Sequence, residues 1–179
     1  MKEEKAPQKQ FGCYGNALAN FLLQTGDTPT ALKVFYRFSE HPLVMHDGGI
    51  SQAAIPKITE DLTLQKYQAT VYSNYNRETL EQSIREKDSE NAEEIMKLID
   101  EEEEQGRLIA CTGGFRCKLP SIFLLAKHPT FNGSSGHAVL YMGEGLYIDY
   151  GDWKKYSKDQ IKLCGVVEIS PNPHKSPNL

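Results

Sequence analysis

The chain has 179 residues, of which 39% are apolar and 25% are charged, as in an ordinary globular domain. Its net charge is −4 and its basic residues are scattered, which argues against nucleic acid as a partner, and no apolar run is long enough to cross a membrane. The charged start, Met1–Lys5, has no apolar export signal after it and predicts a cytoplasmic protein, but a signal removed earlier would leave the same sequence.

Residues 1–169 are predicted to form one domain, and residues 170–179, rich in proline, asparagine and serine, a disordered tail. The four cysteines are too few for a disulfide-stapled protein, and no pair has CxxC spacing. Cys111 and Cys164 lie in apolar, strand-like segments and are expected to be buried hydrophobic side chains. We predict neither a cofactor nor a metal.

The first third of the chain predicts three helices. Residues 14–24 and 51–61 carry apolar residues at helical spacing, and Gly26 ends the first of these segments. Between them, Thr28 is expected to cap a helix that has Pro29 at its first position. The apolar face of this helix is expected to consist of Leu32, Phe35 and Phe38.

After a strand predicted over residues 65–73, the acidic stretch 76–105 predicts two helices. Asn91 and Glu94 have the spacing of a capping box at the start of the second helix. Glu101–Glu104 is interpreted as the solvated, frayed end of that helix, because four negative charges there oppose the helix dipole.

The second half of the chain predicts mainly strands, and Gly143–Gly145 should form the turn of a hairpin. The predicted strands cover residues 108–111, 122–125, 137–142, 146–150 and 161–169. Helices followed by an antiparallel sheet indicate the α+β class.

Cys13 stands at the expected start of the first helix, after Gly12. The unpaired amides and the dipole of a helix N-terminus favour an anion, so a thiol placed there tends to ionise and become a nucleophile. A buried structural cysteine would be expected within the apolar stripe instead.

A thiolate nucleophile needs a proton acceptor, and His137 is the best placed of the five histidines. It follows a flexible loop and opens an apolar strand, which would hold the ring rigidly beside a cleft. His41 and His128 precede prolines in turns, and His174 lies in the predicted tail.

The strand that returns from the hairpin offers two acids to orient His137. A tight two-residue turn would pair His137 with Asp152, whereas a wider turn or a bulge would bring Asp149 into place. The sequence leaves both open.

The ordered set of a cysteine opening a helix in Gly12–Ala17, two further helices, and the hairpin motif Gly136–Gly143 followed by Ile148–Asp149 resembles the papain-like cysteine peptidase superfamily, most of all its C39-like branch. The resemblance covers roughly residues 7–169 and implies a papain-like fold, with N-terminal helices packed on a C-terminal antiparallel sheet. It also implies a peptide or protein substrate and a catalytic triad of Cys13, His137 and Asp149.

In that superfamily a glutamine upstream of the cysteine completes the oxyanion hole. Gln8 is the better match here and Gln10 the alternative, although the usual position, six residues before the cysteine, holds Pro7. Tyr14 also departs from the glycine common in C39-like sequences, and could narrow the cleft or mark a member that binds without cutting.

Three other functions stay open on the sequence. The scaffold could carry an acyltransferase or transglutaminase-like enzyme, or an inactive peptide-binding module. A metal site built from His41, His46 and Asp47 with a cysteine is the third, but a His-Asp pair before two glycines is usually a plain turn.

Overall fold

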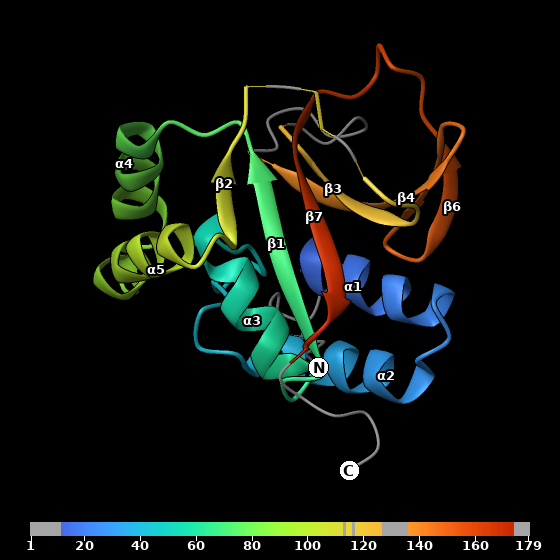
Figure 1. Cartoon of the computed structure of the whole chain (residues 1–179), viewed down its shortest axis with the longest axis horizontal. Helices are drawn as coiled ribbons and strands as arrows, with labels where there is room; N and C mark the ends of the chain where they lie inside the picture. The colour runs from blue at the N-terminus through green and yellow to red at the C-terminus, as the bar shows by residue number, and fades with distance from the viewer. Residues whose placement is uncertain (1–11, 113, 116, 127–135, 174–179) are drawn as a thin grey trace, which may run out of the picture.

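The computed structural model describes residues 12–112, 114–115, 117–126 and 136–173. Within these ranges the chain is α+β, as predicted, with five α-helices and one seven-stranded, mostly antiparallel sheet (Figure 1). No helix in the described part of the chain combines the length and the apolar character needed to cross a membrane.

The helices lie mainly in the first two thirds of the chain. They are α1 (Cys13–Gln24), α2 (Thr28–Arg37), α3 (Ile55–Leu62), α4 (Arg77–Lys87) and α5 (Ala92–Glu104), with short 3-10 turns η2 (Phe38–Glu40) and η3 (Gln52–Ala54). The strands are β1 (Tyr67–Ser73), β2 (Leu108–Ala110), β3 (Ser121–Leu125), β4 (His137–Gly143), β5 (Leu146–Asp149), β6 (Asp152–Lys155) and β7 (Leu163–Pro171). The short strand β6 was not predicted.

The last strand of the chain, β7, is inserted between β1 and β3 in the sheet order β2-β1-β7-β3-β4-β5-β6. It is antiparallel to both neighbours, and among the described strands only the β1–β2 pair is parallel. Tyr67 pairs with Pro171, so Ser170 and Pro171 belong to the sheet and the predicted tail begins too early. Residues 174–179 of that tail lie outside the described residues.

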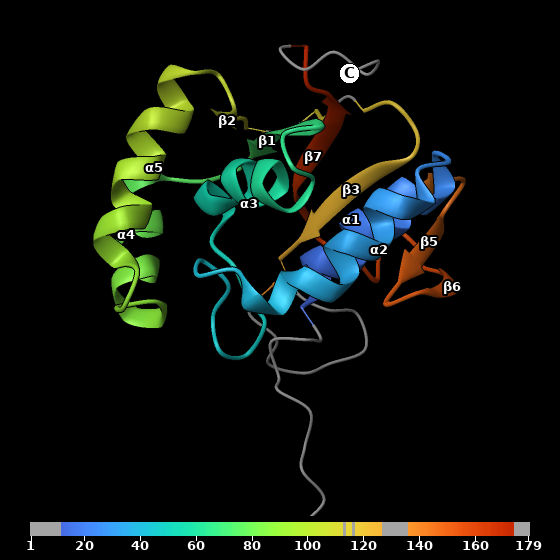
Figure 2. The ribbon, with the colours of Figure 1, turned by 90° about the horizontal axis from the view of Figure 1, so that it is seen from below.

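The helix α1 packs across strands β3, β4 and β5 (Figure 2). Its buried face includes Leu18 and Leu22, which join one large core with Ile122, Leu140 and Ile148 of the sheet. A second, smaller apolar cluster is formed by Phe123, Leu125, Val139, Tyr147, Tyr156 and Val166. The two clusters alternate along β3 and β4 because successive side chains of a strand point to opposite faces.

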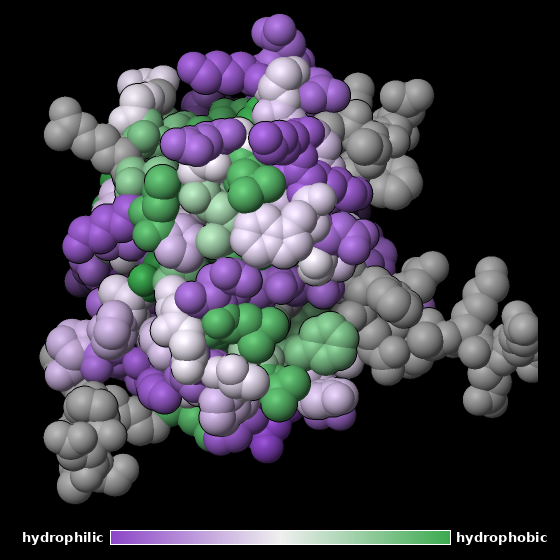
Figure 3. All heavy atoms as spheres, turned by 90° about the vertical axis from the view of Figure 1, so that its right-hand side faces the viewer, coloured by the Kyte–Doolittle hydropathy of each residue, from purple (hydrophilic) through white to green (hydrophobic). Residues whose placement is uncertain are grey.

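The apolar face predicted for α2 was wrong in two of its three residues. Leu32 and Phe35 are about half exposed, at 50% and 52%, whereas Ala31, Val34 and Phe38 are buried. Asp27, not Thr28, caps this helix by accepting a hydrogen bond from the Thr30 amide. Figure 3 views the side formed by β6 and the adjacent ends of α1 and α2, where exposed apolar patches alternate with polar ones.

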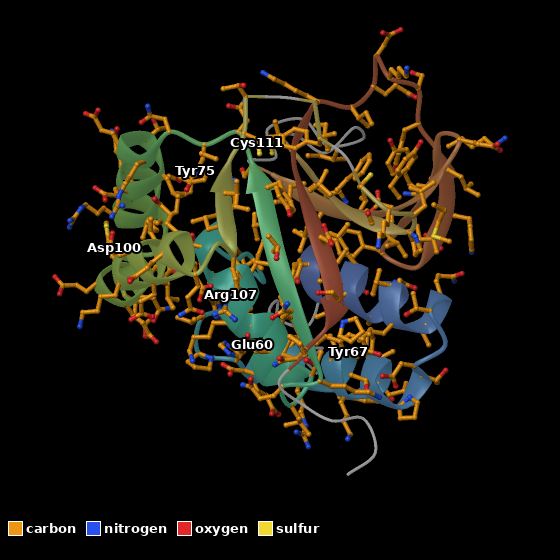
Figure 4. The ribbon with its side chains drawn as sticks, in the orientation of Figure 1. Glu60, Tyr67, Tyr75, Asp100, Arg107 and Cys111 are labelled. Atoms are coloured by element: carbon orange, nitrogen blue, oxygen red, sulfur yellow. The ribbon has the colours of Figure 1, made fainter. Side chains whose placement is uncertain are left out.

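The acidic end of α5 is only partly as predicted: Glu101, Glu103 and Glu104 are exposed, but the turn stays helical to Glu104 and Glu102 is buried. Glu102 is 2% exposed and its carboxylate binds the Arg107 guanidinium through two contacts of 2.5 and 2.6 Å. Arg107 also pairs with Glu60 of α3, which lies beside it in Figure 4. The predicted capping box is also absent: Asn91 caps no amide and donates to Pro42 O and Asp88 Oδ1 instead.

The buried pair of Glu102 and Arg107 gives a stability prediction. Arg107→Ala should lower the free energy of unfolding by about 3–5 kcal/mol, because it leaves the Glu102 charge buried without a partner. Urea denaturation monitored by circular dichroism measures the change. The matched control is Arg77→Ala, which removes an exposed arginine bound to Glu81 and Asp100 and should cost no more than about 1 kcal/mol. Equal losses in the two variants would contradict the prediction.

Candidate active site

Cys13 is the first residue of α1, as the sequence predicts, and Gly12 precedes it in extended conformation. A Cβ atom on Gly12 would lie 2.0 Å from the Phe38 ring and 2.6 Å from the Gly48 carbonyl oxygen. Glycine is therefore needed where the chain enters the helix, because two other segments press against the backbone there. This close packing fixes the position of the Cys13 thiol relative to the loop before α3.

Cys13 and His137 line the same cleft, which has a volume of about 430 Å³. One wall comes from the 45–55 segment and α4, and the other from the ends of β3 and β4 together with Cys164 of β7. The cysteine and histidine are separated by more than 120 positions in the sequence, and the packing of α1 on β4 brings them together.

The His137 ring is fixed by Asp149. Its Nε2 atom lies 2.7 Å from Asp149 Oδ1, and the two residues are only 7% and 1% exposed. The Tyr156 hydroxyl donates to the other carboxylate oxygen, Asp149 Oδ2, at 2.9 Å. Both oxygens of this buried carboxylate thus have partners, which reduces the cost of burying its charge.

A bulge in the hairpin explains why Asp149, not Asp152, meets His137. The tight turn leaves Gly143 opposite Leu146, but the register shifts so that Tyr141 pairs with Tyr147. This shift by one residue places Asp149 on the strand face that carries His137. Asp152 is exposed and begins β6, across a turn from Asp149.

The second partner of the His137 ring is Cys13. Burial lowers the pKa of His137, but the hydrogen bonds to Asp149 and Cys13, with electrostatic attraction to both, outweigh it and raise this pKa from 6.5 to about 9. Since Nε2 contacts Asp149, Nδ1 is the nitrogen left to face the thiol. His137 is thus positively charged at neutral pH and lies between a carboxylate and a sulfur atom.

Two tyrosines lie next to the catalytic candidates, Tyr150 against the His137 ring and Tyr14 directly after Cys13. The Tyr150 ring lies 5.2 Å from the His137 ring, and Tyr150 is 47% exposed. Tyr14, which could have narrowed the cleft, is 1% exposed, and its hydroxyl hydrogen-bonds to Thr59 of α3 at 2.5 Å. Its main contact is therefore with the core.

Several site residues were not predicted as such. Tyr156 holds Asp149, while Ser51, Gln52 and Asp88 line the cleft. They come from three separate segments, and no local motif marks them. Both oxyanion candidates, Gln8 and Gln10, lie outside the described residues. In the described part of the chain Gln52 is the glutamine that lines the cleft, and its Oε1 accepts a hydrogen bond from Ser73.

In the described residues, neither the other cysteines nor the predicted metal ligands form an arrangement like that of Cys13 and His137. Cys111, Cys117 and Cys164 are free and partly buried, so Cys111 and Cys164 are less buried than expected. His41 binds Asp61 through Nε2 and accepts the Leu43 amide at Nδ1. In the ranges given above, no group of three or more histidine, cysteine or acidic side chains is placed to hold a metal ion.

Compared with known proteins, the chain matches no family model, no curated protein and no solved structure.

The pKa of His137 gives a test of the Asp149 contact. Asp149→Asn should lower this pKa from about 9, because burial then opposes protonation with less compensation. The pKa of His137 in the folded protein is above its ordinary value of 6.5, so the folded state binds this proton more tightly than the unfolded chain does. This adds to the free energy of unfolding fully below pH 6.5, and the contribution is lost as the pH rises through about 9. NMR titration of the imidazole measures the pKa. Asp152→Asn is the matched control and should leave the pKa of His137 unchanged. A lower pKa of His137 in Asp152→Asn but not in Asp149→Asn would show that Asp152, not Asp149, contacts the ring.

Proposed function

We propose that this protein is a thiol hydrolase of papain-like fold that cleaves a peptide or amide bond, with Cys13 as nucleophile, His137 as acid–base and Asp149 as the group that orients His137. The observation that supports it most is the position of the buried His137 ring, held by Asp149 on one side and by Cys13 on the other, in a cleft large enough for substrate. The α+β architecture, with α1 packed on the sheet, fits the resemblance seen in the sequence.

The proposed reaction begins with the sulfur of Cys13 at the helix N-terminus, where backbone amides favour a negative charge. The thiolate attacks the substrate carbonyl carbon, and a C–S bond forms. His137 gives its proton to the departing amine as the C–N bond breaks, leaving a thioester. Water then loses a proton to His137 and attacks the thioester, which releases the acid and restores the thiolate.

Asp149 acts through His137 rather than on the substrate. Its hydrogen bond to Nε2 keeps Nδ1 directed at the sulfur and stabilises the positive ring. Tyr156 in turn holds the carboxylate, so the orientation is set by buried contacts of 2.7 and 2.9 Å. The Cys13 amide and Gln8 are proposed to hold the negative oxygen that develops on the substrate carbonyl.

Alkylation of Cys13 tests the nucleophile. Iodoacetamide should label Cys13 faster than Cys111, Cys117 or Cys164 at pH 7, and Cys13→Ala should abolish that fast label. His137→Gln should slow it by roughly tenfold or more, because the positive ring no longer stabilises the thiolate. The difference in Cys13 labelling rate between the wild type and His137→Gln should shrink as the pH rises beyond about 9, where His137 loses its own charge.

Peptide mapping by mass spectrometry gives the rate for each cysteine, and the other three serve as internal references. Glutamine is chosen at position 137 because its amide can still donate to Asp149, which limits the loss of stability. Labelling of Cys13 at the rate of the other cysteines, with no response to His137→Gln, would remove the basis for a nucleophile.

The oxyanion donor is tested by two neighbouring glutamines. Gln8→Ala should lower kcat for hydrolysis of a fluorogenic peptide amide by about 100- to 1,000-fold with little change in KM, because the donor acts mainly in the transition state. Gln10→Ala is the matched comparison. The larger loss in Gln10→Ala would transfer the role to that residue, and small losses in both would point to another donor such as Gln52.

A further inference from the structure

Two buried polar atoms lack a partner in the described part of the chain, and both belong to residues that line the cleft with Cys13 and His137. They are Ser51 Oγ and Asp88 Oδ2, and their residues are 9% and 7% exposed. Buried polar groups are nearly always hydrogen-bonded, because an unpaired one loses its contacts with water. Their occurrence together on one cleft points to a ligand that would satisfy both.

The two oxygens of Asp88 differ in their surroundings. Asp88 follows the last residue of α4, and Oδ1 accepts a hydrogen bond from the Asn91 side chain at 3.3 Å. This contact ties the end of α4 to the start of α5 and accounts for one oxygen. The other oxygen, Asp88 Oδ2, is buried and has no hydrogen-bond partner among the described residues. Ser51, similarly, precedes η3 but its hydroxyl caps no amide of that turn.

The electrostatic environment of Asp88 favours a positive ligand. Burial raises the pKa of the Asp88 carboxyl, the hydrogen bonds from Asn91 lower it, and the negative charges of Glu90 and Asp47 raise it further. The C-terminal end of α4 adds the negative pole of a helix dipole. Lys87 also lines the cleft but forms no ion pair with Asp88 in the described part of the chain. A cation bound at Oδ2 would relieve this concentration of negative charge.

The same wall carries apolar side chains beside polar ones such as Asp47, Gln52 and Ser83. Ile50, Ile55, Leu80 and Ile84 line the cleft together with Ser51 and Asp88. Four aliphatic side chains beside a buried carboxylate and a buried hydroxyl fit a long aliphatic stem with a cationic end, which is the form of a lysine or arginine side chain. A short acidic or purely apolar side chain would leave Asp88 Oδ2 buried and unpaired.

We propose that this wall is a specificity subsite for a basic residue of the substrate, with Asp88 Oδ2 and Ser51 Oγ accepting hydrogen bonds from its cationic nitrogen. The inference rests on the proposed thiol hydrolase function and adds the substrate class. Asp88 and Ser51 are binding residues here, not catalytic ones.

The test compares electrophilic peptides that differ in one charge. Peptidyl acyloxymethyl ketones carry arginine, or its neutral isostere citrulline, at the first, second or third residue from the electrophile. The rate of Cys13 modification is measured by intact-protein mass spectrometry and divided by the iodoacetamide rate of the same variant. At one position the arginine probe should react at least about tenfold faster than the citrulline probe, because only arginine pairs with the buried carboxylate.

Variants assign the preference to a residue. Asp88→Asn should reduce the arginine preference to near unity, because it removes the charge while keeping an oxygen for Asn91. Glu90→Gln removes the same charge two residues away, at an exposed position, and should retain most of the preference. Equal wild-type rates for arginine and citrulline at all three positions, or a preference that survives Asp88→Asn, would overturn the subsite.

A binding measurement separates this inference from the catalytic proposal. Cys13→Ala is titrated by NMR with a tripeptide amide that contains arginine and with its citrulline counterpart. Tighter binding of the arginine peptide, lost when Asp88→Asn is added, would support the subsite even if no electrophile modified Cys13 in the wild type. Equal affinities for the two peptides would overturn it, whatever the reactivity of the thiol.

Discussion

The hydrogen bond between His137 and Asp149 is the contact on which the candidate site depends. It holds Nε2 of the buried ring and leaves Nδ1 to face the sulfur of Cys13. The bond exists because a single bulge in the β4–β5 hairpin changes the register, and because Tyr156 satisfies the second oxygen of the buried carboxylate. A bulge of one residue thus determines which acid contacts His137.

The fold brings the two halves of the site together through its core. Helix α1 packs on β3, β4 and β5, so the end of the helix that carries Cys13 lies beside the strand end that carries His137. The contact of Gly12 with Phe38 and Gly48 fixes the helix start against the segment that forms one wall of the cleft. Strand β7, inserted between β1 and β3, joins the helical half of the chain to the hairpin.

Buried polar groups have two distinct roles in this molecule. Tyr14 with Thr59, and Glu102 with Arg107, are mutually satisfied and tie helices to one another and to the loop before β2. Ser51 Oγ and Asp88 Oδ2 are buried without partners in the described residues, and both belong to the cleft. Because unsatisfied groups are costly, their presence in the cleft that Cys13 also lines is the basis of the proposed subsite, and the charges around Asp88 favour a cationic ligand there.

The sequence by itself determined the local features: the helix that begins at Cys13, the strand that begins at His137, the hairpin at Gly143–Gly145 and the α+β order. These follow from capping, periodicity and turn chemistry, which act over a few residues. Tertiary structure decided the rest. The choice of Asp149 over Asp152 depended on a bulge, the exposure of Leu32 and Phe35 depended on which row of α2 packs on its neighbours, and the burial of Glu102 depended on an arginine that follows its helix. Ser51 and Asp88 were not predicted because only packing between distant segments buries them on one wall.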